Sequence, residues 1–392
     1  MSRRVLFITG EYPPMRGGIS DYTERLVSAL DGTGWEPWAL THAAVQENPD
    51  PRVLARITAW DWSLAGKVRQ AIADSRAEIV HIQYQTGAFA MHPAINLLPL
   101  ALRRSGPRIP VVTTFHDLRK PYLFPKAGVI RRWANRALAF GSAGIVVTNE
   151  DDYRQLMRFP RLAQRTEVIP LGGSLPGPSV VDRPAVRRRL GIAESDCAIG
   201  FFGFVTRDKG LDLLIDALER LPAHRPHLVI VGGELADTDL TSSTIARQIR
   251  RRLSGSSVPV TMTGHLDARS AAETLAVLDL IVLPFLGGAT LRSSSLIAAV
   301  RSGTAVLTTS PKSQGSLRPL KGGESIGFVP AGEVSPLARG IQALLSDPAR
   351  RQRLSENAKT AAAAFDWSAI ANRHAAFYAR LVHARTRPRG QD

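Results

Sequence analysis

Residues 5–30 read VLFITGEYPPMRGGISDYTERLVSAL, and this stretch decides the fold class. Its first five residues, Val5–Thr9, form an almost continuous apolar run of strand length, and Ser20–Leu30 carries apolar residues at helical spacing. The loop between them is rich in Gly and Pro, which interrupt regular structure. A strand, a glycine loop and a helix in that order predict the opening unit of a parallel α/β sheet.

The same alternation continues along the chain. Further strands are predicted at 37–40, 79–83, 111–115, 144–148 and 167–169, and helices at 66–73, 94–103, 130–140 and 150–157. After the Gly-, Ser- and Pro-rich residues 172–184, strands are predicted at 198–203, 228–231, 258–263, 280–284, 305–309 and 325–329. The accompanying helices are predicted at 211–221, 241–253, 269–278, 294–302 and 336–345. Residues 348–385 are expected to be helical, with a break near 365–367.

A chain of 392 residues is too long for one ordinary core, so two domains are expected. The predicted fold class is α/β, with two doubly wound, Rossmann-like domains that face a central cleft. Residues 1–175 form the first domain, 176–365 the second, and 366–392 a final helix and basic tail. In such sheets ligands bind outside the carboxyl ends of the strands, which directs attention to the loops that follow them.

The composition is globular, with 44% apolar and 21% charged residues. The single cysteine, Cys197, excludes an intramolecular disulfide framework and a cysteine-based zinc cage, and its apolar surroundings predict a buried structural thiol. The first apolar run is too short for a signal peptide, and no run approaches the roughly 20 residues of a membrane-spanning helix. We therefore expect a cytoplasmic protein.

The formal net charge of +16 leaves several partners open. Arginines spread over solvated faces would give this value without any specific partner. A role at the anionic inner face of a membrane is the main functional alternative. Nucleic acid is not expected as a partner, because no zinc-finger spacing or aromatic RNA-binding signature accompanies the arginines.

The first loop able to carry chemistry is residues 10–20. Gly17 and Gly18 let the backbone approach a ligand closely, and the helix that follows offers free amides with a partial positive charge. This arrangement suits a phosphate. The loop is neither a G-x-G-x-x-G fingerprint nor a Walker loop, which disfavours generic dinucleotide and nucleoside-triphosphate sites. A plain tight turn would use the same residues.

The second loop is GFVTRDKG, residues 203–210, at the start of the second domain. Lys209 near a helix N-terminus opposes the helix dipole, and a bound anion would offset that cost. The loop therefore predicts an anion site that includes Lys209. An exposed loop lysine is the alternative.

The third loop begins at Thr113-Thr114-Phe115-His116-Asp117, where a predicted strand ends. His116 stands at the edge where sheet ligands bind, and it could hydrogen-bond a sugar hydroxyl or a departing phosphate. A core or capping histidine is the alternative.

The fourth loop is PFLGGATLRSSSL, residues 284–296, which leads into a helix of small residues. Glycines, hydroxyls and one arginine at a helix start form a further anion site. A serine-capped helix is the alternative. Three loops with anion-binding chemistry at matching places in two α/β units support one another.

Together these motifs resemble glycosyltransferase family 4, with the GT-B fold, over nearly the whole chain. Glu11-Tyr12-Pro13-Pro14 followed by Gly17-Gly18 is similar to the family's opening motif, and residues 114–117 are similar to its first-domain histidine motif. Residues 203–210 match the motif whose lysine grips the donor diphosphate. Residues 365–367 and the final helix resemble the segment that crosses back onto the first domain, which makes Trp367 a packing anchor.

The resemblance implies an acceptor-side first domain and a nucleotide-sugar-binding second domain. It implies catalytic roles for His116, Lys209 and Arg292. It implies donor-binding roles for Glu11, Gly17, Gly18, Gly203, Arg207, Gly288, Thr290, Ser293 and Ser294. The implied reaction is a retaining transfer, without cofactor or divalent metal, to a glycan, a lipid-linked acceptor or a small molecule.

Two features depart from the family pattern. Phe204 stands where the family usually has an arginine, and Arg207 is the candidate replacement. The family's paired glutamates, spaced E-x7-E, are absent, and Thr290 and Ala298 occupy their positions. The segment around Arg292 resembles that of a divergent branch with an arginine–serine run.

The missing glutamates leave open a non-catalytic protein that binds a nucleotide-sugar. A nucleotide-sugar epimerase or a phosphorylase of the same fold is a weaker alternative. Asp237-Thr238-Asp239 matches the D-x-D pattern of some metal sites, but its position in a polar loop disfavours a metal site.

Overall fold

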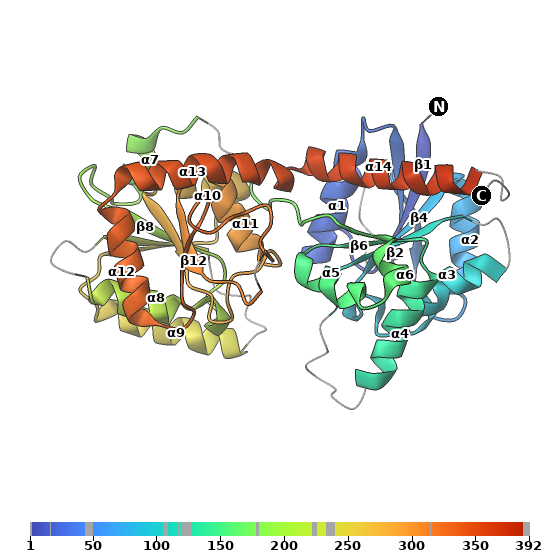
Figure 1. Cartoon of the computed structure of the whole chain (residues 1–392), viewed down its shortest axis with the longest axis horizontal. Helices are drawn as coiled ribbons and strands as arrows, with labels where there is room; N and C mark the ends of the chain where they lie inside the picture. The colour runs from blue at the N-terminus through green and yellow to red at the C-terminus, as the bar shows by residue number, and fades with distance from the viewer. Residues whose placement is uncertain are drawn as a thin grey trace. The chain divides into compact units, whose positions relative to one another are not determined.

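The computed structural model describes residues 2–15, 17–43, 50–104, 109–116, 118, 128–177, 180–221, 226–232, 240–313 and 315–386, with no side-chain description for 128–131, 240–246 and 386. The chain forms two units, each with its own parallel sheet (Figure 1). The first comprises Met1–Leu171 and Trp367–Asp392, and the second comprises Gly172–Asp366. The sequence placed the corresponding boundaries at 175/176 and 365/366.

The first unit is built on a seven-stranded parallel sheet in the order β3-β2-β1-β4-β5-β6-β7. Its strands are β1 (Arg3–Thr9), β2 (Trp35–His42), β3 (Val53–Ile57), β4 (Ile79–Tyr84), β5 (Val111–Phe115), β6 (Gly144–Val147) and β7 (Thr166–Val168). The central strand β1 pairs in parallel with β2 on one side and with β4 on the other. The strand order therefore reverses between β1 and β4, and this is where doubly wound sheets bind ligands.

Helices cover both faces of this sheet. They are α1 (Gly18–Leu30), α2 (Leu64–Ser75), α3 (Ala94–Arg104), α4 (Gly128–Gly141), α5 (Glu150–Met157), α6 (Pro160–Ala163) and α14 (Trp367–Thr386), with the 3₁₀ turn η1 (Gly87–Phe89). Leu26 of α1 and Tyr378 of α14 are buried in one core, against one face of the sheet. Helices α2 to α6 bury their apolar sides in the other core. Helix α14 packs against α1, and Figure 1 shows it running across one side of the first unit.

The second unit repeats the plan with six parallel strands in the order β10-β9-β8-β11-β12-β13. The strands are β8 (Ala198–Phe202), β9 (His227–Val231), β10 (Val260–Gly264), β11 (Leu280–Leu283), β12 (Val306–Thr309) and β13 (Gly327–Val329). The helices are α7 (Arg183–Arg189), α8 (Leu211–Glu219), α9 (Leu240–Ser254), α10 (Ala268–Ala276), α11 (Ser294–Arg301), α12 (Val334–Leu345) and α13 (Pro348–Ala362), with η3 (Arg207–Lys209) and η4 (Ala363–Phe365). Here the order reverses between β8 and β11.

The predicted fold class is confirmed, and the predicted helix break falls at η4. The short elements β3, α6 and α7 and the 3₁₀ turns η1 and η3 were missed. In the edge strand β3 only the end residues Val53 and Ile57 are buried and Arg56 is exposed, so it lacks the apolar run of a central strand. The prediction of a buried Cys197 was wrong, because this residue precedes β8 and its side chain is exposed.

Two properties of the chain bear on experiments. No helix among the described residues is long and apolar enough to cross a bilayer.

All six tryptophans and all six tyrosines lie in the first unit, so tryptophan and tyrosine fluorescence reports on that unit alone.

A buried polar contact ties α14 to the first sheet. The Tyr378 hydroxyl lies 2.6 Å from His81 Nδ1, and His81 Nε2 lies 2.7 Å from the Thr114 hydroxyl. All three residues are fully buried. Burial lowers the pKa of His81 well below its usual value, so this ring is neutral and each of its nitrogens has a partner.

Replacing Tyr378 by Phe should lower the free energy of unfolding of the first unit by about 1–3 kcal/mol, because it leaves a buried imidazole nitrogen unpaired. Tryptophan fluorescence during urea unfolding measures this change. Tyr153→Phe is the matched control, since its hydroxyl has no hydrogen-bond partner in the described part of the chain. Equal stability of the two variants would contradict this role for the Tyr378 hydroxyl.

Candidate active site

Lys209 is the central cation of the candidate site in the second unit. It ends η3, just before α8, and its side chain is half-buried. Its Nζ donates a hydrogen bond to Ser293 Oγ at 3.3 Å and lies 4.9 Å from the centroid of the Phe285 ring. No carboxylate among the described residues lies within ion-pair distance of it. Burial lowers the pKa of Lys209, partly offset by the charge of Asp208.

The loop that contains Lys209 is held against the end of β11 by close backbone packing. The Leu286 amide donates to the Asp208 carbonyl at 3.0 Å. Gly210 has a left-handed backbone with φ of 69°, and a β-carbon there would lie 2.2 Å from the Pro284 carbonyl oxygen. Only glycine fits this position, because both the conformation and the contact exclude a side chain.

Ser293 joins the two loops chemically. It is the N-cap residue of α11, yet its side chain makes no capping hydrogen bond. Instead its hydroxyl contacts Lys209 and lies 2.8 Å from the hydroxyl of buried Ser295. This arrangement disfavours the alternative of a plain serine-capped helix, because the serine faces the lysine rather than the helix amides.

The other predicted residues of this unit lie around the same edge of the sheet. Gly203 follows β8 with φ of 129°, and a β-carbon there would lie 3.4 Å from Ser295 Cβ. Gly288 has φ of 83° and packs against the Ser310 carbonyl. Thr290 Oγ1 accepts the amide hydrogen of Arg292, whose side chain is half-buried. Arg207 and Ser294 are exposed, next to the Lys209–Ser293 contact in the chain.

In the first unit, the β1–α1 loop places Glu11 against Gly17. Glu11 Oε2 lies 2.5 Å from where a β-carbon of Gly17 would stand, so any side chain there would displace the Glu11 carboxyl group. Burial raises the pKa of Glu11. No atom of the described residues lies within 4 Å of where a β-carbon of Gly18 would stand, so Gly18 is the open position of the pair.

His116 lies beyond β5 on the α1 side of the sheet. Its ring packs edge-on against Tyr22 of α1, with 4.8 Å between centroids. Its Nε2–H donates to Gln83 Oε1 at 2.7 Å, which leaves Nδ1 as the lone-pair nitrogen of the neutral ring. Burial, reinforced by the charge of His374, lowers the pKa of His116 to about 4. The imidazole is therefore neutral near pH 7.

Sequence reasoning missed Gln83 and Phe285. Gln83 is the buried polar residue near the end of β4, and Phe285 follows β11 beside Lys209. A signal for Gln83 existed, since it is a polar residue near the end of a mostly apolar strand, which pairs with the strand before His116. Two other motif positions, Asp117 and Asp237-Thr238-Asp239, lie outside the described residues.

Comparison with known families gives these two units an assignment. Residues 17–172 match the profile of the Glycosyl transferase 4-like domain, and residues 196–347 match that of Glycosyl transferases group 1. The chain belongs to glycosyltransferase family 4. The first matched segment lies in the first unit except for its last residue, and the second matched segment lies in the second unit.

Curated relatives of this family 4 chain include a D-inositol 3-phosphate glycosyltransferase of Geodermatophilus obscurus, 30% identical over 284 residues. That match covers 68% of this chain and 60% of the relative, so the chain spans about 60% of the length of that protein. A Corynebacterium glutamicum protein, named as a GDP-mannose-dependent mannosyltransferase of a monoacylated phosphatidylinositol monomannoside, is 22% identical over 89% of this chain and 91% of its own.

Solved structures show the same GT-B fold. Sucrose-phosphate synthase of Thermosynechococcus elongatus has a TM-score of 0.75 at 21% identity, covering 97% of this chain and 100% of that one. Anabaena HepE, solved in complex with UDP, has a TM-score of 0.74 at 20% identity, covering 96% of this family 4 chain and 100% of its own.

Gly210→Ala should weaken the binding of nucleoside diphosphate at least about tenfold, because the new β-carbon displaces the Lys209 loop from β11. Isothermal titration with UDP and GDP measures this. Gly191→Ala is the matched control: its φ of 71° carries the same backbone cost, but nothing lies within 4 Å of its β-carbon. An equal loss of affinity in both variants would show that packing against Pro284 is unimportant.

Gln83→Glu should raise the pKa of His116 by about 1 unit or more, since a carboxylate that accepts the Nε2–H stabilises the imidazolium. NMR titration of the His116 ring gives this pKa directly. Gln83→Leu removes the acceptor without adding charge and should not raise it. An unchanged value in Gln83→Glu would refute the contact.

Proposed function

We propose that this protein is a glycosyltransferase that moves a sugar from a nucleotide-diphosphate sugar to a hydroxyl acceptor, with retention of configuration. The observation that carries the proposal is Lys209, a half-buried ammonium that donates to Ser293 and has no carboxylate within ion-pair distance among the described residues. A partly buried cation that no carboxylate contacts is costly, and a diphosphate would supply the contacting negative charge.

The donor chemistry follows from the residues at the β8 and β11 ends. Departure of a nucleoside diphosphate develops negative charge, which fixed cations and helix amides stabilise without reorganising. Lys209 and the hydroxyl of Ser293 would meet the diphosphate, and Arg292 would add positive charge. The UDP complex of HepE and the GDP-mannose dependence in the Corynebacterium name support a nucleotide-sugar donor. The base and sugar stay open.

On the first unit, Gly18 offers an open backbone position beside the N-terminus of α1 for phosphate or sugar. The neutral His116 ring presents Nδ1 as an acceptor for a sugar hydroxyl. In the proposed reaction the acceptor oxygen bonds to the anomeric carbon as the bond to the phosphate oxygen breaks. The acceptor proton passes to the leaving phosphate on the same face. No resident cofactor takes part.

The acceptor is proposed to be a lipid-linked or phosphorylated polyol. The relatives are named for inositol phosphate and for phosphatidylinositol acceptors, which are anionic. A chain of net charge +16 suits such molecules and a peripheral position at the inner face of the membrane. This places the proposed activity within envelope glycan or glycolipid synthesis.

A separate observation favours a second candidate function, nucleotide-sugar binding without transfer. Thr290 and buried Ala298 stand where the family has paired glutamates, so a protein that binds nucleotide-sugar without transferring it is the alternative. Calorimetry with UDP-, GDP- and ADP-sugars, followed by transfer assays on phosphatidylinositol, inositol phosphate and soluble sugars, separates the two. Binding without turnover across these acceptors supports the alternative. Absence of all binding would rule out both.

Lys209→Ala should reduce transfer at least about 100-fold and weaken donor binding, because the diphosphate loses its buried cation. Single-turnover assays and calorimetry measure the two effects. Lys359→Ala, which removes an exposed lysine of α13, is the matched control. Wild-type turnover in Lys209→Ala would remove this lysine from the mechanism.

A further inference from the structure

The sequence around α3 and α4 carries almost only positively charged residues. Between Glu78 and Glu150 it contains seven arginines and two lysines but one acidic residue, Asp117. The helices α3 and α4 pack side by side, and neither contains an acidic residue. A long cationic segment of this kind attracts an anionic partner.

The same helices expose large apolar side chains. Leu97 and Leu100 of α3 and Trp133 and Phe140 of α4 are exposed, Trp133 to 66%. Leu100 contacts the end of α4, since a β-carbon on Gly141 would lie 3.4 Å from Leu100 Cγ. We call these four residues, with Arg103, Arg104, Arg132 and Arg136, the α3–α4 face. Exposed apolar patches bordered by charges mark interaction surfaces.

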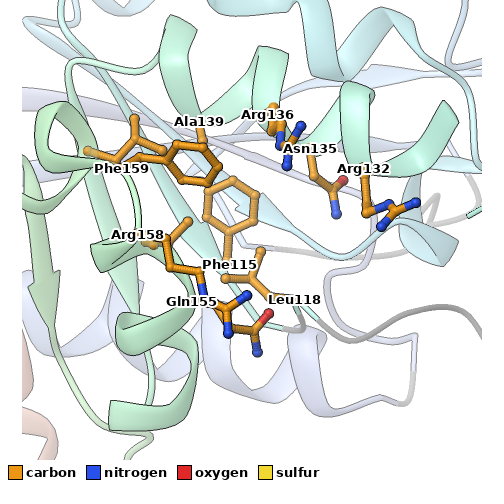
Figure 2. A pocket seen from close by; sticks show the side chains of 11 residues that line it. Phe115, Leu118, Arg132, Asn135, Arg136, Ala139, Gln155, Arg158 and Phe159 are labelled. Atoms are coloured by element: carbon orange, nitrogen blue, oxygen red, sulfur yellow. The ribbon is translucent and has the colours of Figure 1, made fainter. Parts of the chain in front are cut away.

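A cavity of about 340 Å³ adjoins this face, between α4 and the α5–α6 segment. Figure 2 shows the Phe115 and Phe159 rings at its middle, with Arg132 and Arg136 on the α4 side and Arg158 on the α5 side. The Arg136 guanidinium lies 5.2 Å from the centroid of Phe159. None of its lining residues is acidic. Guanidinium groups around an apolar floor suit a phosphate ester that carries an apolar group.

This cavity is separate from the candidate active site. Phe115 packs into the core beneath α2 to α6, whereas the next residue, His116, contacts Tyr22 of α1 on the opposite face of the sheet. Alternation along a strand sends successive side chains to opposite faces. A ligand in the cavity therefore does not occupy the space beside the His116 ring.

We propose that the α3–α4 face docks on an anionic lipid bilayer, with the adjoining cavity receiving the phosphate of a lipid headgroup. Arginine and tryptophan together are typical of the interface between headgroups and acyl chains. Nucleic acid offers the same phosphates but no apolar phase for Leu97, Leu100 and Phe140. The inference rests on the peripheral membrane location in the proposed function and names the surface that would bind the membrane. It does not require sugar transfer.

The test is cosedimentation of the full chain, without donor, with phosphatidylcholine vesicles that contain or lack phosphatidylglycerol. Binding is expected only to the anionic vesicles and should weaken as salt rises. Arg132→Glu/Arg136→Glu should reduce the affinity at least about tenfold. The matched control is Arg188→Glu/Arg189→Glu, an equal charge change at two exposed residues of α7.

Trp133→Ala tests the apolar contribution and should also weaken vesicle binding, whereas Met262→Ala on the second unit should not. Three outcomes would overturn the proposal: no preference for anionic vesicles, an equal loss in the α7 control, or binding only to a single-stranded oligonucleotide. Calorimetric titration of the same variants with UDP and GDP keeps the two claims apart. Vesicle binding without donor binding defeats the proposed function alone, and the reverse defeats this inference alone.

Discussion

Parallel pairing on both sides of a buried strand is the constraint on which each unit depends. β1 lies between β2 and β4, and β8 lies between β9 and β11, so the carboxyl ends of these strands meet at one edge. Parallel strands need crossover helices, which cover both faces and bury the strands. Polar side chains can therefore converge on a ligand only in the loops, at the point where the strand order reverses.

In the second unit this convergence produces an electrostatic imbalance. The loop after β8 brings Lys209 to the loop after β11, where it meets Ser293 and the Phe285 ring. The contact is half-buried, and burial lowers the pKa of Lys209 more than the nearby charge of Asp208 raises it. The fold thus holds a positive charge in a poorly solvated place, which is the condition under which an anionic ligand binds most strongly.

In the first unit the corresponding edge is organised by neutral imidazoles. His116 donates to Gln83, and His81 is held between Thr114 and Tyr378 of α14. Burial lowers the pKa of both histidines, so their hydrogen bonds fix ring orientation without introducing charge. The C-terminal helix contributes to this order, and Trp367 at its start packs on Tyr22, as its predicted role as an anchor requires. The helices α3 and α4, which cover the opposite face of the same sheet, carry arginines and exposed apolar side chains.

The sequence by itself determined the two α/β units, nearly all strands and helices, and the four loops that carry the candidate site. These are local properties, since apolar runs, helical spacing and glycine positions act over a few residues. It could not identify Gln83 as the partner of His116, or Ser293 as the partner of Lys209, because these pairs are 33 and 84 residues apart and meet only after the strands pair. It also misjudged Cys197, whose apolar neighbours belong to a strand that begins one residue later. Strand pairing in three dimensions decided which side chains meet, and burial then decided their charge.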